Sequence, residues 1–276
     1  MTWADPRLTT TEHLLGATLE AVRPLTGGTH ARAYGAVVNG VDVVVRFFPA
    51  GDKAVASELE ALREISPLMS SFEVPELVAA DAETGVIVTT RVRGAHPDPN
   101  LSAERLAVPL ARALAQIHSL APGGLSAPPL VVRGASALAE ATRERWGELS
   151  SAARVLGHGD FWCGNALWDR DQLTGVVDWS GARAAAAGLD VAWCRQDLIL
   201  LGSRHAAEVF LTAYLAERPL SGSILAWDLH AAAHAEGRVA TWAPNYAGIG
   251  RSLLTGEILE QRFATWTSEL LAAAND

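Results

Sequence analysis

The feature that most constrains this chain is a glycine-bounded segment near its middle that carries polar residues at fixed spacings. Residues 157–168 have the sequence GHGDFWCGNALW, which contains Asp160 and Asn165. The apolar run LTGVV follows at 173–177 and ends at Asp178. Burying such polar groups without partners is unfavourable, so the fold has to provide partners for them. We predict a loop over 160–165 and a hairpin returning through the apolar run, which together bring the three side chains close.

These three side chains have the chemistry of a magnesium–phosphate site. Carboxylate and amide oxygens are ligands that Mg²⁺ takes from proteins, so Asn165 and Asp178 are candidate metal ligands. A further carboxylate beside such a centre can accept a proton from an attacking hydroxyl group, and Asp160 is the candidate for that role. Each residue alone is equally typical of an ordinary turn. Their order, and the apolar strand that leads into Asp178, favour the metal site.

Composition excludes several classes of protein. The formal net charge is −9 at pH 7, with 49% hydrophobic and 19% charged residues, which indicates a globular chain without the basic face that nucleic-acid binding requires. There are two cysteines, no secretory signal at the N-terminus, and no apolar run longer than a few residues, as at 198–201. We expect a cytoplasmic monomer or homodimer that binds neither nucleic acid nor membrane.

The first third of the chain is predicted to be mainly strands around one helix. Asn39-Gly40 between two strand patterns is a strong hairpin signal. The period of the apolar residues favours a helix at 52–65. Strand patterns lie at 21–25, 33–38, 41–48, 77–80 and 86–88.

The rest of the chain is predicted to be mainly helical, after a break near 93–100. Amphipathic helices are expected at 102–120 and 135–149, and further helices from about 189, interrupted at Pro219, Pro244 and 248–250. We therefore predict an α+β fold with a small β-rich lobe at 1–93 and a larger helical lobe at 94–276. Ligands commonly bind in the cleft between two such parts.

The central motif resembles a known family. HGDFWCGN followed by VVDW is similar to the signature of aminoglycoside phosphotransferases and related small-molecule kinases, whose fold is protein-kinase-like. The resemblance implies that Asp160 is the catalytic-loop Asp and Asn165 the loop Asn. It also implies that Asp178 is the metal-binding Asp, and that His158 orders the loop instead of carrying protons.

Two further residues have implied structural roles. The sequence GLDVAW at 188–193 also matches the family, which implies that Asp190 braces the catalytic loop through backbone hydrogen bonds. A helix N-cap is the competing interpretation of Asp190. His118 lies on a helix that the family places before the catalytic core, and we expect it to be structural.

The N-terminal third is expected to bind the nucleotide. Gly27, Gly28 and Thr29 form a loop whose backbone N–H groups can lie over phosphates, although an ordinary hairpin explains them equally well. Protein kinases place a lysine on the third strand, but the single lysine, Lys53, starts the following helix, and Arg46 occupies the strand position. Arg46 is the expected phosphate-binding cation.

The partner of Arg46 and the purine site follow from the same resemblance. Glu58 is the expected carboxylate partner, with Glu60 and Glu64 as alternatives. Thr90 and Val92 lie where the strand joining the lobes would offer backbone groups to a purine.

The acceptor site is expected among the C-terminal helices. Asp190–Asp276 contains ten acids against six arginines, a mild bias that does not identify a polycationic acceptor. Core packing is the competing interpretation of the aromatic residues there. The candidates are Trp227, Asp228, His230, His234, Glu236, Trp242, Asn245, Tyr246 and Glu257.

The sequence thus predicts an enzyme: a Mg²⁺-dependent kinase that transfers the γ-phosphate of ATP or GTP to a hydroxyl group of a small molecule. An aminoglycoside or another antibiotic is one such acceptor. A nucleotide-binding pseudokinase without transfer activity is the main alternative. A metal hydrolase using His158, Asp160, Cys163 and Asp178 is a third, with a spacing that is not typical of zinc sites.

Overall fold

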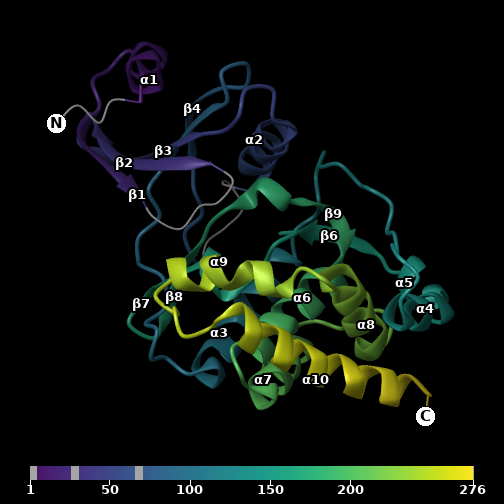
Figure 1. Cartoon of the computed structure of the whole chain (residues 1–276). Helices are drawn as coiled ribbons and strands as arrows, with labels where there is room; N and C mark the ends of the chain where they lie inside the picture. The colour runs from purple at the N-terminus through teal and green to yellow at the C-terminus, as the bar shows by residue number, and fades with distance from the viewer. Residues whose placement is uncertain (1–4, 26–30, 66–70, 276) are drawn as a thin grey trace.

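The chain folds into two lobes of different composition, as the sequence predicts (Figure 1). The computed structural model describes residues 5–25, 31–65 and 71–275. The first lobe is an antiparallel sheet with two helices, α1 (Arg7–Leu15) and α2 (Lys53–Ile65). The second is mainly helical. No helix within the described ranges is long and apolar enough to span a membrane.

The N-terminal sheet has five strands in the order β1-β2-β3-β5-β4. The hairpin between β2 and β3 turns at Asn39 and Gly40, which have φ values of 51° and 80°. Both residues need the left-handed region in a two-residue hairpin turn, and Asn-Gly adopts it readily, so the predicted hairpin is confirmed. The strands are β1 (Glu20–Leu25), β2 (Arg32–Val38), β3 (Val41–Phe47), β4 (Leu77–Asp81) and β5 (Val86–Thr90).

Side-chain alternation along β3 divides its residues between two faces. Val43, Val45 and Phe47 are buried in a hydrophobic cluster on one face, against which α1 packs. Because successive residues of a strand point to opposite faces, Arg46 points the other way, toward α2. No sequence pattern predicted the helix α1.

Two short two-stranded sheets hold the central motif, and the second of them is a hairpin. β6 (Arg154–Gly157) pairs with β9 (Arg183–Ala186), and β7 (Ala166–Asp169) pairs with β8 (Gln172–Val176). Short 3₁₀ helices η2 (Cys163–Asn165) and η3 (Trp179–Gly181) lie between them. The predicted hairpin returning to Asp178 is therefore confirmed.

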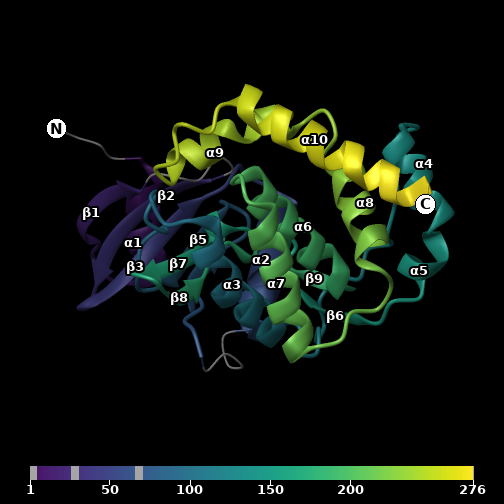
Figure 2. The same cartoon turned by 90° about the horizontal axis from the view of Figure 1, so that it is seen from below.

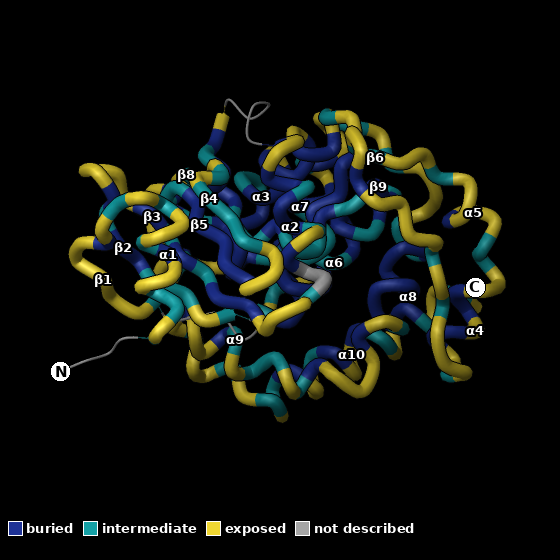
Figure 3. The backbone as a smooth tube through the Cα atoms, turned by 90° about the horizontal axis from the view of Figure 1, so that it is seen from above, coloured by how far each residue is buried: buried dark blue, intermediate teal, exposed yellow. Residues whose placement is uncertain are grey.

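The helical lobe surrounds one large core. In Figure 2, α10 extends along the outside of α6 and α8, and in Figure 3 the backbones of α3, α6 and α8 are largely buried. The helices are α3 (Ala103–Ile117), α4 (Ala137–Glu144), α5 (Trp146–Ser150), α6 (Ala187–Leu200), α7 (Arg204–Glu217), α8 (Ile224–Ala235), η4 (Val239–Trp242), α9 (Ala243–Gly248) and α10 (Gly256–Asn275).

One expectation about these helices is wrong. The single helix predicted at 135–149 is divided at Arg145, which leaves helical geometry while its guanidinium donates to Ala274 O of α10 at 2.7 Å. The interruption predicted at Pro244 is found: η4 ends at Trp242, and Pro244 lies in the first turn of α9, where its missing N–H is not needed.

A buried ion pair joins α6 to α8. Arg195 Nη2 lies 3.0 Å from Asp228 Oδ2, and both side chains are at most 5% exposed. Arg195 also contacts Glu208, whose side chain is 57% exposed. Asp228 is therefore a core residue, and its predicted place among the acceptor-site residues is wrong.

We predict that the two partners of Arg195 differ sharply in their effect on stability. Asp228→Ala leaves a buried guanidinium without its main partner and should lower the free energy of unfolding by about 3–5 kcal/mol. Glu208→Ala, the matched control, removes an exposed partner and should change it by less than about 1 kcal/mol. Urea unfolding of both variants measures this. Equal losses would contradict the assignment of the pair to the core.

Candidate active site

The loop between β6 and β7 is fixed by one buried carboxylate. Asp190, in the first turn of α6, is 3% exposed. It accepts hydrogen bonds from the backbone N–H groups of His158, at 2.7 Å, and Gly159, at 2.9 Å. Burial alone would raise the pKa of Asp190, but its hydrogen bond with His118 and its attraction to Arg183 hold it below its usual value. The N-cap of α6 is Ala186, so the N-cap interpretation of Asp190 is wrong.

Two buried histidines extend this brace. His118 Nε2 lies 3.3 Å from Asp190 Oδ2, and its Nδ1 lies 2.7 Å from the hydroxyl of Tyr214. The Nδ1 atom of His158 accepts the backbone N–H of Asp160 at 3.3 Å, so its Nε2 carries the proton and donates to Val177 O at 3.1 Å. Burial lowers the pKa of His158, which favours this neutral form. His118 therefore joins Asp190 to Tyr214, and His158 joins the loop of Asp160 to Val177.

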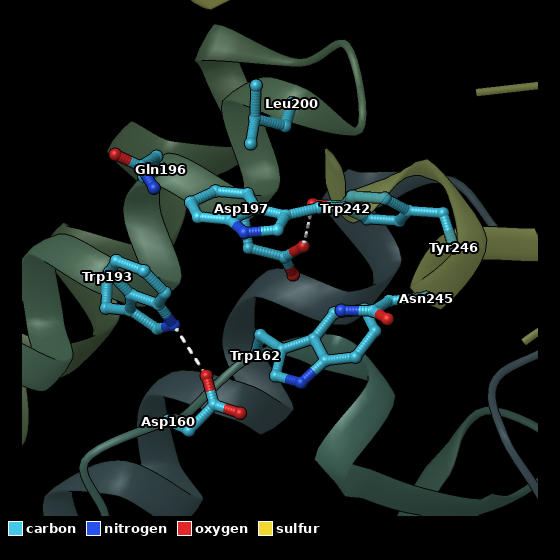
Figure 4. A pocket seen from close by; sticks show the side chains of 9 residues that line it. All are labelled: Asp160, Trp162, Trp193, Gln196, Asp197, Leu200, Trp242, Asn245 and Tyr246. Atoms are coloured by element: carbon cyan, nitrogen blue, oxygen red, sulfur yellow. Dashed lines mark hydrogen bonds between the residues drawn. The ribbon is translucent and has the colours of Figure 1, made fainter. Parts of the chain in front are cut away.

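Asp160 is held at both carboxylate oxygens. Trp193 Nε1 donates to Oδ1 at 3.0 Å (Figure 4), and Asn165 Nδ2 donates to Oδ2 at 3.2 Å. Burial, followed by repulsion from Asp178, raises the pKa of Asp160 to about 6. The carboxylate is thus oriented by two neutral donors and lies next to a second acid.

Asn165 and Asp178 supply the oxygen atoms that a hard cation requires. Asn165 Nδ2 donates to the backbone oxygen of Asp160 at 2.9 Å as well as to its side chain, which leaves Asn165 Oδ1 as its free acceptor. The backbone oxygen of Asn165 accepts from Val177 N–H at 2.9 Å, so the two loops are joined directly beside Asp178.

Asp178 has an unusual backbone and a strongly polar environment. Its φ of 61° lies in the left-handed region, which is uncommon for residues other than glycine and recurs at functional sites. Its Oδ1 accepts from Ser180 Oγ at 2.9 Å and from Arg46 Nη2 at 3.2 Å. Burial alone would raise the pKa of Asp178, but Arg46 and Ser180 hold it below its usual value.

This donor set fits Mg²⁺. One amide oxygen and one carboxylate leave most coordination positions to water and phosphate oxygens, which is how Mg²⁺ is commonly bound. Within the described ranges, no three His, Cys, Asp or Glu side chains gather into a metal cage. Cys163 is buried and its pKa is raised well above the usual value, so its thiol is not available as a thiolate ligand. The geometry speaks against the hydrolase alternative.

Arg46 links the two lobes. Its Nη1 atom pairs with Glu58 of α2 and its Nη2 with Asp178 of the helical lobe. Glu58 is 1% exposed, and burial raises its pKa to about 7 although Arg46 opposes the shift. Of the three candidate carboxylates, the structure brings Glu58 to Arg46. Glu60 and Glu64 lie instead beside the glycines at 123 and 124.

The structure describes two of the remaining nucleotide-site candidates, Thr90 and Val92. Thr90 uses its backbone N–H and its hydroxyl to bind the backbone of Glu76, both at 2.9 Å. Val92 follows at the end of the sheet, and its backbone N–H has no hydrogen-bond partner in the part of the chain that is described. Gly27, Gly28 and Thr29 lie outside the described residues.

A pocket opens beside Asp160 (Figure 4). Trp193 and Asp160 point toward each other across it, and Tyr246 donates to Asp197 at 2.8 Å on its far wall. Of the acceptor-site candidates, Trp242, Asn245 and Tyr246 line this pocket. The whole lining is Asp160, Trp162, Trp193, Gln196, Asp197, Leu200, Trp242, Asn245 and Tyr246.

Other candidates lie elsewhere, and some lining residues were missed. Trp227 is fully buried in a core cluster, and its indole N–H donates to Ser221 O. Glu236 and Glu257 are exposed. Gln196, Asp197 and Leu200 line the pocket and were missed. With Trp193 they follow one face of α6 at helical spacing, but this helix is buried nearly all round, so its sequence does not single out that face.

We predict that the pKa of Asp160 responds in opposite directions to two substitutions. Asp178→Asn removes a negative neighbour and should lower the pKa from about 6. Trp193→Phe removes a donor that stabilises the carboxylate and should raise it. Carboxyl-carbon NMR titration of the metal-free protein measures both shifts. Shifts of the same sign would show that these neighbours do not control the charge of Asp160.

Comparisons with known proteins identify the family of the chain. The model of the phosphotransferase enzyme family, APH, matches residues 21–227. No curated protein resembles the chain closely enough in sequence to count as a match.

Solved structures resemble this fold over nearly the whole chain. Macrolide 2'-phosphotransferase MphH from Brachybacterium faecium is 20% identical with a TM-score of 0.62, covering 98% of this chain and 96% of its own. ADP-bound aminoglycoside phosphotransferase APH(2'')-Ib is 18% identical with a TM-score of 0.61, covering 97% of each chain. A thermostable mutant of aminoglycoside phosphotransferase APH(4)-Ia, in complex with AMP-PNP and hygromycin B, is 16% identical with a TM-score of 0.64, covering 95% and 98%.

The family model spans well over half of the chain and includes both the strand of Arg46 and the loop of Asp160. The protein therefore belongs to the phosphotransferase enzyme family of antibiotic and small-molecule kinases.

Proposed function

We propose that this protein transfers the γ-phosphate of ATP or GTP to a hydroxyl group of a small molecule. The observation that carries the proposal is that side chains from three separate segments meet at one place. Arg46 of β3 contacts Asp178 after β8, and Asn165 contacts Asp160 within the catalytic loop. Phosphoryl transfer depends mainly on positioning and on neutralising charge, and these residues are suited to both.

The acceptor side of the reaction belongs to Asp160. Trp193 and Asn165 fix its carboxylate, so it meets a hydroxyl group in the adjoining pocket in one orientation. The hydroxyl oxygen forms the new bond to the γ-phosphorus, and its proton passes to Asp160. The bond from the γ-phosphorus to the bridging oxygen breaks, and the nucleoside diphosphate leaves.

The nucleotide side belongs to the sheet and the loop after β8. Arg46 binds phosphate oxygens and Glu58 fixes the direction of its guanidinium. Asn165 and Asp178 hold Mg²⁺, which when bound neutralises charge on the phosphates. Val92 N–H, Thr90 and the loop of Gly27, Gly28 and Thr29 are the proposed contacts to the purine and the phosphates. ATP is favoured by relatives of the same fold solved with ADP or AMP-PNP.

We expect Asp160→Asn to lower kcat by about 10²–10⁴-fold, because the amide cannot accept the proton. The KM for nucleotide should stay nearly constant, since Asp160 faces the acceptor. Mass gain of one phosphate, followed over a panel of sugars, amino alcohols, hydroxy acids and antibiotics, is the assay. Asp171→Asn, in the exposed β7–β8 turn, is the matched control and should be fully active.

Two outcomes would contradict this role. Unchanged turnover in Asp160→Asn would remove Asp160 from the reaction. Mg²⁺-dependent ATP binding by the wild type without transfer to any acceptor would favour the pseudokinase alternative.

Substitutions at Arg46 should act on the nucleotide. Arg46→Gln loses charge-assisted hydrogen bonds to phosphate and should raise the KM for ATP about tenfold or more. Arg46→Lys retains a cation without the bidentate geometry and should give an intermediate KM. Arg63→Gln, an exposed arginine on α2, is the control. If the substitutions change the KM for the acceptor and leave the KM for ATP unchanged, Arg46 does not bind the nucleotide.

A further inference from the structure

A second groove adjoins the pocket of Asp160 and carries the opposite charge to the protein as a whole. Trp193 and Trp242 line both cavities, and Gly159 of the catalytic loop lines the groove. The groove therefore reaches the residue that precedes Asp160. Its other walls come from β9, from α8 and from the segment 128–133 before α4.

The lining of the groove holds four arginines and one carboxylate. That carboxylate, Asp190, accepts the backbone N–H groups of His158 and Gly159, and it attracts Arg183 without forming an ion pair with it. Within the described residues, none of the four lining arginines forms an ion pair with an acid, although the net charge of the chain is −9. The cationic and imidazole side chains of the groove are Arg133, Arg154, Arg183, Arg238, His230 and His234.

Three of these arginines lie close enough to His234 to affect its charge. Burial, followed by repulsion from Arg238, His230, Arg133 and Arg183, lowers the pKa of His234 to about 4. Burial and repulsion from Arg183 likewise lower the pKa of His230. The arginines and both imidazoles line the same groove, and the positive charge of this lining comes from the arginines.

Arg183 carries this charge to the catalytic loop. It is half-buried at the start of β9, and its Nη1 donates to Gly181 O at 3.2 Å. The same nitrogen lies only 2.8 Å from where a Cβ on Gly159 would be, so the guanidinium lies directly against the loop. An anion bound there would be next to the loop and to the acceptor pocket.

We propose that the acceptor is a hydroxyl compound that carries a carboxylate or a phosphate group. Its anionic end binds Arg183 together with Arg133 and Arg238, its body lies against Trp193 and Trp242, and its hydroxyl group meets Asp160. The inference rests on the proposed function and narrows its substrate class. Unpaired arginines attract oxyanions and repel amines, so polycationic aminoglycosides are excluded as good substrates.

The proposal is tested first by binding, without turnover. Calorimetry on the full chain with saturating AMP-PNP and Mg²⁺ uses four probes of similar size: phenyl phosphate, benzoate, benzyl alcohol and benzylamine. Phenyl phosphate or benzoate should bind at least about tenfold more tightly than benzylamine. The stronger of the two anions identifies phosphate or carboxylate as the preferred group.

Variants locate the binding. The double variant Arg133→Gln/Arg238→Gln changes exposed side chains and should weaken anion binding about tenfold or more, as should Arg183→Gln. Arg112→Gln, on an exposed part of α3, is the control and should not change it. The inference is overturned if benzylamine binds as tightly as the anions, if no anion binds, or if the groove variants bind like the wild type.

A second assay separates this inference from the proposed function. Hydroxy acids and sugar phosphates are compared with gentamicin by phosphate transfer, and the acids should have at least a tenfold higher kcat/KM. Transfer to gentamicin or neutral alcohols alone would overturn the inference and leave the kinase function standing. Activity that persists in Asp160→Asn would overturn the proposed function. The binding measurements would still show whether the groove prefers anions.

Discussion

The position of the catalytic loop depends on the buried carboxylate of Asp190. It replaces the solvation of its charge with two backbone N–H groups and His118, and it thereby fixes the path of the chain immediately before Asp160. His158 continues the link from this loop to Val177, one residue before Asp178. Without this carboxylate, the two backbone donors and the Nε2 atom of His118 would be buried without partners, which is strongly unfavourable.

Asp160 and Asp178 are neighbouring acids whose surroundings shift their pKa values in opposite directions. Asp160 is held by neutral donors in a partly buried place, which raises its pKa, whereas Asp178 faces a guanidinium, which lowers its pKa. Under the proposed function, such a separation suits Asp160 to accept a proton and Asp178 to remain charged. Arg46 completes the arrangement, because it ties the charged acid to the sheet of the other lobe.

Local patterns predicted much of this architecture. Asn39-Gly40 specified its hairpin because few other pairs adopt that turn, and alternation along β3 placed Arg46 opposite the hydrophobic cluster. The order of Asp160, Asn165 and Asp178 indicated their convergence. These features depend on a few neighbouring residues, so they are visible in the sequence.

Features set by distant contacts were not predictable in this way. β9 is rich in alanine and has no strand signal of its own; it is a strand because Val155 and Leu156 pair with it. The helix α6 is buried nearly all round, so its sequence does not reveal which face lines the pocket. Asp228 was misassigned because only the fold shows that it meets Arg195.

The most direct test of the account is a crystal structure of the protein with AMP-PNP and Mg²⁺. The account predicts an ion ligated by Asn165 Oδ1 and Asp178, phosphate oxygens on Arg46, and an Asp160 carboxylate that faces the pocket without touching the metal. An ion ligated by Asp160, or phosphates bound away from Arg46, would contradict it.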